Sequence, residues 1–174
     1  MIHLPMQAKE GQNGYKADPG ANALYTEYDL DKVRKLASAN IDMLKDISVG
    51  VNNHMGSKFT EWQEGMAEVF NIVNNSQLMF LDSLTTPNST AGKVGESFAS
   101  VPLLKRDVFL DHVIEEDKIM QALEKTVSIA KANGSAIAIG HPHEETIRVL
   151  KKWVNTLEDK NIQLVPITAL IKEK

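Results

Sequence analysis

Short, uninterrupted apolar runs alternate with amphipathic segments along most of this chain, and that alternation constrains the fold more than any other feature. We interpret six runs as buried strands, at residues 1–6, 47–51, 77–81, 108–110, 136–139 and 162–167. Strands without a polar face are typical of a parallel sheet that is covered by helices on both faces. The sequence therefore predicts an α/β fold. Periodicity alone leaves open either a doubly wound sheet or an incomplete (β/α) barrel.

Four amphipathic segments between these runs predict helices. The first begins at Asp29, a suitable N-cap, and has apolar residues on one face as far as Leu44. The second follows Thr60-Glu61-Trp62-Gln63, which has the form of a capping box. The third, from Glu115 to Asn133, stops before Gly134, a residue type common just after helix C-termini.

The fourth predicted helix has Pro142 in its first turn, where the missing N–H of proline is tolerated. Its buried stripe would be Ile147, Leu150, Val154 and Leu157. Residues 7–28 and 84–100 predict loops, the second with room for one short helix. Loops longer than about 12–15 residues in compact domains are often functional.

The composition of the chain argues against several classes of function. The net charge of −4 over 174 residues argues against a nucleic-acid partner or an anionic membrane surface. No apolar run approaches the roughly 20 residues of a membrane-spanning helix. The absence of cysteine excludes disulfides, thiolate metal ligands and cysteine nucleophiles, so any metal would have nitrogen and oxygen ligands. The length predicts one domain over residues 1–174.

Five polar side chains stand at the ends of predicted strands, where the active sites of α/β folds lie. They are His3, His54, Asp82, Asp111 and His141. Imidazole and carboxylate together suit zinc or a similar divalent ion, which lowers the pKa of a bound water towards about 7. The set therefore indicates hydrolysis, with a further histidine able to protonate a leaving amine. His112 and His143 fall later in their segments and are expected to be exposed.

Each of these residues also has a structural interpretation. A histidine at a strand end is often a hydrogen-bonded structural residue, and Asp82 and Asp111 could each cap the next turn. Arg106-Asp107 could be a solvated ion pair of little energetic value. The sequence contains no phosphate loop, dinucleotide fingerprint, nucleophile elbow or His-Glu-x-x-His motif.

Five blocks of sequence stand at these strand ends and span nearly the whole chain. They are His3-Leu4-Pro5-Met6, Gly50-Val51-Asn52-Asn53-His54-Met55-Gly56-Ser57, Phe80-Leu81-Asp82-Ser83, Arg106-Asp107-Val108-Phe109-Leu110-Asp111 and Ala136-Ile137-Ala138-Ile139-Gly140-His141-Pro142. In this order they resemble the divergent polysaccharide deacetylase family, a branch of the carbohydrate-esterase deacetylases. The resemblance implies a parallel-strand (β/α) barrel that is distorted and incomplete at its N-terminus. It also implies metal-dependent removal of N-acetyl groups from acetylated amino-sugar glycans in the cell envelope or periplasm.

The resemblance implies site residues as well. By position, His3 and His54 would be metal ligands, with zinc the expected ion, and His141 would be the catalytic acid. The residues expected to line or orient the catalytic site are Asp82, Arg106 and Asp107. The residues expected to contact the glycan substrate are Asn53, Ser83 and Asp111. The resemblance leaves the oligomeric state open, and an oligomer is possible.

Two departures from the family pattern lead to a rival hypothesis. Family members carry paired acidic residues on an early strand that would precede His3, so we expect the first strands of the barrel to be missing here. Leu84 stands where family members have Arg after Asp82-Ser83. Without the metal-binding Asp and the base, the chain would be a non-catalytic glycan-binding or scaffold relative of the deacetylases.

Overall fold

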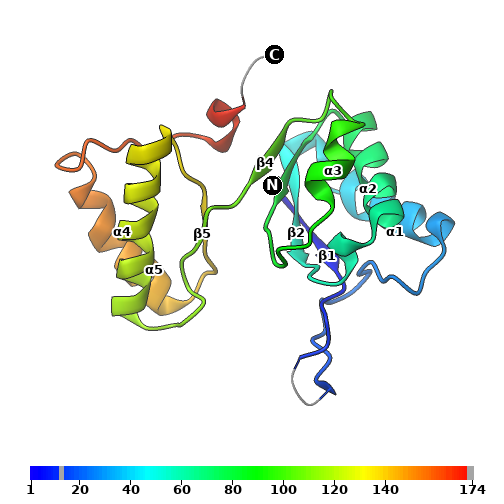
Figure 1. Cartoon of the computed structure of the whole chain (residues 1–174), viewed down its shortest axis with the longest axis horizontal. Coiled ribbons are helices and arrows are strands. Elements are labelled where there is room, and N and C mark those ends of the chain that lie inside the picture. Colours follow the sequence, from blue (N-terminus) through cyan, green and yellow to red (C-terminus); the bar gives the residue numbers. More distant parts are fainter. Residues whose placement is uncertain (12–13, 172–174) are drawn as a thin grey trace. The chain divides into compact units, whose positions relative to one another are not determined.

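The computed structural model describes residues 1–11 and 14–171, and the chain divides into two compact units, Met1–Lys105 and Arg106–Lys174 (Figure 1). Both units combine parallel strands with helices, as the alternation predicts. The single domain over residues 1–174 stays a prediction. None of the helices in the described ranges is long and apolar enough to span a membrane.

The first unit contains a four-stranded parallel sheet with the order β1-β2-β3-β4. Its strands are β1 (Ile2–Met6), β2 (Gly50–Met55), β3 (Met79–Asp82) and β4 (Leu103–Lys105). One register row joins Ile2, Val51, Phe80 and Leu103 across the sheet. Because all four strands run the same way, the residues that follow them gather at one edge of the sheet.

Three helices share a hydrophobic core with this sheet: α1 (Leu30–Asp42), α2 (Gln63–Asn75) and α3 (Ala91–Glu96). The Asp29 side chain accepts a hydrogen bond from the Lys32 N–H at 2.7 Å, which confirms the predicted N-cap of α1. The helix ends at Asp42, so Leu44 lies beyond it and is exposed rather than buried. The residues of α2 that are buried in this core include Met66, Val69, Phe70 and Val73.

Gly50 allows β2 and β3 to approach closely. A Cβ atom at this position would lie 2.8 Å from the Met79 carbonyl oxygen and 2.3 Å from Met79 Cγ. Only a residue without a side chain therefore fits this first position of β2.

The second unit is built on β5 (Val108–Phe109) and β6 (Ala138–Ile139), which pair in parallel. Helices α4 (Glu116–Asn133) and α5 (Glu144–Trp153) pack with them around a separate hydrophobic core. Gly134 follows α4 with a φ of +85°, in the left-handed conformation that glycine adopts without strain, so the predicted stop is confirmed.

The strand predictions need three corrections. Residues 162–167 form no strand; the Ile162 N–H instead closes a turn on the Leu157 carbonyl, and Ile167–Leu170 is a 3₁₀ helix. An apolar run becomes a strand only where a neighbouring backbone pairs with it. The run at 47–51 becomes β2 three residues later and extends to Met55, so His54 lies inside the strand. The edge strand β4 was not predicted, because only three residues pair there.

The helix starts need correction as well. Thr60 and Glu61 belong to a 3₁₀ turn, Phe59–Glu61, and α2 begins only after Trp62, so the capping-box prediction is wrong. Pro142 lies ahead of α5, whose N-cap is His143. The buried residues of α5 are Thr146, Val149 and Trp153, whereas Ile147 and Val154 of the predicted stripe are exposed.

Candidate functional site

His3 and His54 meet on neighbouring strands of the first unit. His3 is aligned with Asn52, two residues before His54, so the two imidazoles share one face of the sheet. His54 Nδ1 lies 2.9 Å from His3 Nε2, and the ring centroids are 4.6 Å apart. In this hydrogen bond one of the two nitrogens donates its N–H and the other accepts through its lone pair. A divalent ion in place of that proton could take both lone pairs, since zinc–nitrogen bonds are about 2.0–2.1 Å long. The pair therefore fits two ligands of the metal that the sequence predicts.

Asn53 and Ser83 join the ends of β2 and β3. Asn53 Oδ1 accepts a hydrogen bond from the Ser83 N–H at 2.8 Å, and Ser83 Oγ donates to the Asn53 carbonyl at 2.8 Å. Asn52 Nδ2 donates to Ser83 Oγ at 3.1 Å. Both Asn53 and Ser83 are buried. These contacts hold the two strand ends in place, while direct contact of Asn53 and Ser83 with substrate stays a prediction.

Asp82 is buried at the end of β3 and organises the loop that follows. Its Oδ1 accepts from the Leu84 N–H at 2.8 Å, and its Oδ2 accepts from Ser89 Oγ at 2.7 Å. Asp82 thus caps the next turn, which is the structural role that the sequence allowed for this residue. Leu84 has a φ of +48° and Met55 a φ of +53°. Left-handed backbone at a residue other than glycine costs about 1–2 kcal/mol and is concentrated at functional sites.

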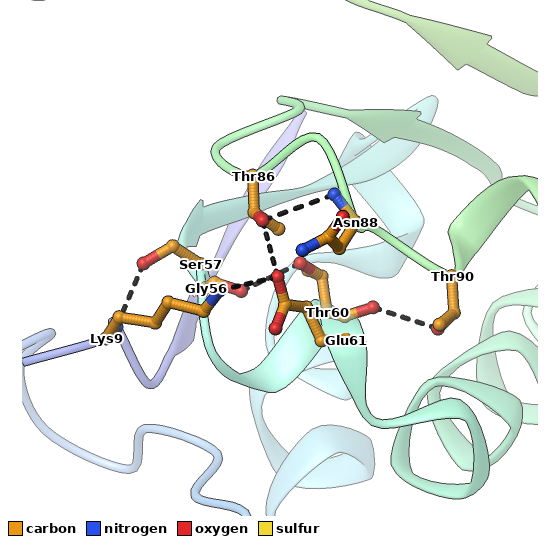
Figure 2. Close-up of polar contacts among 8 residues, drawn as sticks. All are labelled: Lys9, Gly56, Ser57, Thr60, Glu61, Thr86, Asn88 and Thr90. Carbon is orange, nitrogen blue, oxygen red and sulfur yellow. Dashed lines mark hydrogen bonds and ion pairs between the residues drawn. The ribbon is translucent and has the colours of Figure 1, made fainter.

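Glu61, a residue within the predicted capping box, instead joins the segments that follow β1 and β3 (Figure 2). Lys9 Nζ lies 2.7 Å from Glu61 Oε1, and Thr86 Oγ1 donates to the same oxygen at 2.6 Å. The hydrogen bonds from Lys9 and Thr86 lower the pKa of Glu61 below its ordinary value. The contact partners lie 52 and 25 residues away, so no local sequence pattern reveals this role.

The loop after β2 is fixed by the same group of residues in Figure 2. The Lys9 N–H donates to Ser57 Oγ at 2.9 Å. Thr60 Oγ1 donates to the Gly56 carbonyl, and both the N–H and the hydroxyl of Thr90 donate to the Thr60 carbonyl, each at 2.8 Å. The segments that follow three parallel strands are therefore tied into one hydrogen-bonded network at the edge of the sheet.

In the second unit, Asp111 and His141 form a hydrogen-bonded pair beyond the ends of β5 and β6. The Asp111 side chain is 1% exposed, and its Oδ1 lies 3.0 Å from His141 Nδ1. Its Oδ2 accepts from the His141 N–H and from Thr146 Oγ1. Burial acts to raise the pKa of Asp111, but the hydrogen bonds from His141 and Thr146 outweigh it, and the pKa lies below its ordinary value. The ionised carboxylate orients the imidazole through Nδ1, on the opposite side of the ring from Nε2.

His143 belongs to the same region, although the sequence predicts it to be exposed. It is half-buried at the N-cap of α5, whereas His112 is exposed, as predicted. Asp111, His141 and His143 each offer one potential ligand atom, and these three atoms lie within 4.8 Å of one another. A cavity of about 320 Å³ is lined by Phe109, Asp111, His112, His141 and His143.

Arg106 and Asp107 stand at the start of β5. Asp107 Oδ2 accepts a hydrogen bond from the Ile137 N–H at 2.7 Å, and the Arg106 guanidinium lies 3.7 Å from the centre of the Phe109 ring. Both side chains contact residues of their own unit, and Asp107 is exposed, so the interpretation of Arg106 and Asp107 as a solvated pair stays open. Their catalytic roles stay predictions, as do the combined roles of residues from different units.

Comparison with known proteins identifies relatives over almost the whole length of the chain. Residues 1–171 match the family model of the divergent polysaccharide deacetylases. The uncharacterized protein YibQ of Escherichia coli K12 is 36% identical over 173 residues, which are 99% of this chain and 52% of YibQ. An uncharacterized protein of Haemophilus influenzae is 33% identical over 165 residues, 95% of this chain and 56% of that protein. The chain thus spans about half the length of these relatives.

A crystal structure of an uncharacterized protein from Agrobacterium tumefaciens C58 has the same fold. It is 26% identical, with a TM-score of 0.82 over 97% of this chain and 67% of that protein. This likeness confirms the predicted fold class, an α/β chain with parallel strands of the distorted (β/α) barrel type. The chain belongs to the divergent polysaccharide deacetylase family.

Proposed function

We propose that this protein is a metal-dependent hydrolase that removes N-acetyl groups from amino-sugar glycans of the cell envelope. The observation that carries the proposal is the Asp111–His141 pair, because a buried carboxylate that holds an imidazole is a common arrangement for general acid catalysis. Membership of a polysaccharide deacetylase family supports the reaction class and an extracytoplasmic glycan as substrate.

His141 would act as the general acid. Cleavage of an amide C–N bond requires a proton on the departing nitrogen, because an amine leaves far more readily than its anion. With Nδ1 held by Asp111, Nε2 of His141 is the atom that would donate this proton. We therefore propose that Asp111 positions the acid, in place of direct substrate contact.

His3 and His54 would hold the divalent ion, and their two imidazoles suit zinc. When bound, such an ion lowers the pKa of a water molecule and polarises a carbonyl group. Asp82 would position the loop after β3, and Arg106 and Asp107 would orient the start of β5. Asn53 and Ser83 would keep the ends of β2 and β3 in register beside the substrate.

The test is release of acetate from N-acetylated chito-oligosaccharides and peptidoglycan fragments by the purified protein with one equivalent of zinc. His141→Gln should lower kcat by about 10²–10⁴-fold, the usual contribution of a general acid, with little change in KM. His112→Gln is the matched control, because His112 lines the same cavity but is not bonded to Asp111 in the described contacts. It should retain wild-type activity.

Metal content gives a second readout. His54→Ala should lower the bound zinc without unfolding the chain, and unchanged zinc in this variant would contradict the ligand assignment. If a zinc-loaded protein releases no acetate from any of these glycans, deacetylation is contradicted. Binding of the same glycans without hydrolysis would then favour the rival hypothesis of a non-catalytic glycan-binding relative.

A further inference from the structure

We infer that Asp111, His141 and His143 form a second binding site for a divalent cation of the Zn²⁺ class. Occupation of this site would take the imidazole of His141 out of proton transfer, so excess metal would inhibit the protein. The inhibition rests on the proposed function, whereas the binding of the ion does not.

The donor set and its spacing carry the inference. Two imidazoles and one carboxylate form a common ligand set for zinc. The three potential ligand atoms lie within 4.8 Å of one another, and around a tetrahedral zinc ion such atoms are roughly 3.4 Å apart. The imidazole of His143 belongs to the N-cap residue of α5. This imidazole makes no capping hydrogen bond to α5, so helix formation does not depend on its position.

Asp111 has acceptor capacity left for a cation. Within the described part of the chain three donors reach it: the His141 N–H, His141 Nδ1 and Thr146 Oγ1. An ion bound at His141 Nδ1 would replace the proton on that nitrogen, so the bonds from the His141 N–H and Thr146 would remain. An ionised carboxylate offers about four lone-pair positions, so two would be left for the cation.

The surroundings favour a positive ion that enters from solvent. The N-terminus of α5 would by itself repel a cation, but Glu144 and Glu145 in the first turn offset that partial charge. The side chain of His141 is 48% exposed and faces the cavity of about 320 Å³ that His143 also lines. Three protein ligands with solvent access leave a coordination position open to water or chloride.

The experiment measures zinc binding by equilibrium dialysis in a His3→Ala/His54→Ala background, which removes the other imidazole pair. In this background we expect one zinc ion per chain. Addition of His143→Ala should weaken the affinity at least tenfold, and His143→Gln should do the same. His112→Ala, which removes an imidazole from the same cavity, should leave the affinity within about twofold. Circular dichroism checks that each variant is folded.

Three results would overturn the inference: no zinc bound in the background variant, an unchanged affinity after His143→Ala, or an equal loss after His112→Ala. Activity separates this inference from the proposed function. If the wild type deacetylates, rising zinc should inhibit it, and His143→Ala should shift the inhibitory concentration at least tenfold upwards. If no variant deacetylates, the proposed function fails, and the dialysis still decides whether the second site exists.

Discussion

Replacement of Asp111 by Asn tests how much one buried carboxylate contributes to the second unit. Asp111 accepts three hydrogen bonds, from the His141 N–H, His141 Nδ1 and Thr146 Oγ1. Asparagine has the same shape, and its single oxygen could keep the bonds from the His141 N–H and Thr146. Its amide nitrogen would then face His141 Nδ1, so the imidazole would have to change tautomer.

The magnitude follows from the loss of charge. A hydrogen bond to a charged group contributes about 1.5–3 kcal/mol to stability, and a neutral one about 1 kcal/mol. For three bonds, one of them from the half-exposed His141 side chain, we expect Asp111→Asn to lower the free energy of unfolding by about 2–4 kcal/mol at pH 7. Asp159→Asn, at an exposed aspartate of the same unit, should stay within about 0.5 kcal/mol of wild type.

Urea unfolding followed by tryptophan fluorescence measures this difference in the free energy of unfolding within the second unit. The chain has two tryptophans, and Trp153 is buried in the core of the second unit. In a Trp62→Phe background the signal therefore comes from Trp153 alone. If Asp111→Asn unfolds at the same urea concentration as its Asp159→Asn control, the carboxylate does not stabilise this unit and the reasoning is refuted.

The same variant predicts a pH dependence. The pKa of Asp111 is lowered in the folded chain, so the carboxylate stabilises the folded state above its unfolded pKa, and this contribution is lost as pH falls through the folded pKa. The gap between wild type and Asp111→Asn should therefore shrink below about pH 4. A gap that stays constant down to pH 2 would contradict this origin.

Three further changes have defined outcomes. Gly50→Ala should lower the free energy of unfolding by about 1–3 kcal/mol in urea, because its Cβ would meet Met79; unchanged stability would contradict the close approach. Gly134→Ala should lower the free energy of unfolding by about 1 kcal/mol, because alanine is strained at the φ of +85° found there, and Gly134→Asn should lower it less. Equal decreases for the two variants would contradict a left-handed C-cap. Glu61→Gln should lower the thermal midpoint at pH 7 by loss of the Lys9 ion pair, and the difference should vanish below about pH 4; a persistent difference would contradict the charge as its cause.

Local signals in the sequence predicted the elements that form mainly from local interactions. Asp29 caps α1 as expected, because the capping bond spans only three residues. The run at 162–167 was misread because pairing with a distant backbone, rather than apolar content, makes a strand. The stripe of α5 was misplaced for a related reason: Ile147 and Val149 are both apolar, and only the position of the neighbouring elements decides which one is buried.

The same difference between local and long-range interactions explains which contacts of the candidate site could be predicted. Side chains that follow parallel strands gather at one edge, so the meeting of Asp111 with His141 could be anticipated. His3 and His54 lie inside β1 and β2 instead, and they meet because the register of these strands places both on one face of the sheet. Glu61 could not, because its partners come from loops whose paths the sequence does not reveal. His143 was missed because its nearness to Asp111 depends on where α5 begins.

The pairing of β5 with β6 involves only two residues on each strand. So short a ladder specifies its alignment weakly, and a slip by one residue would turn every side chain to the opposite face. Asp107 binds the Ile137 N–H and Asp111 binds His141, and each bond spans the same 30 residues. A slipped pairing would break both bonds at once. Two aspartates placed four residues apart therefore set the alignment of these strands. The position of the His141 imidazole depends on these two side-chain contacts more than on the two-residue ladder between β5 and β6.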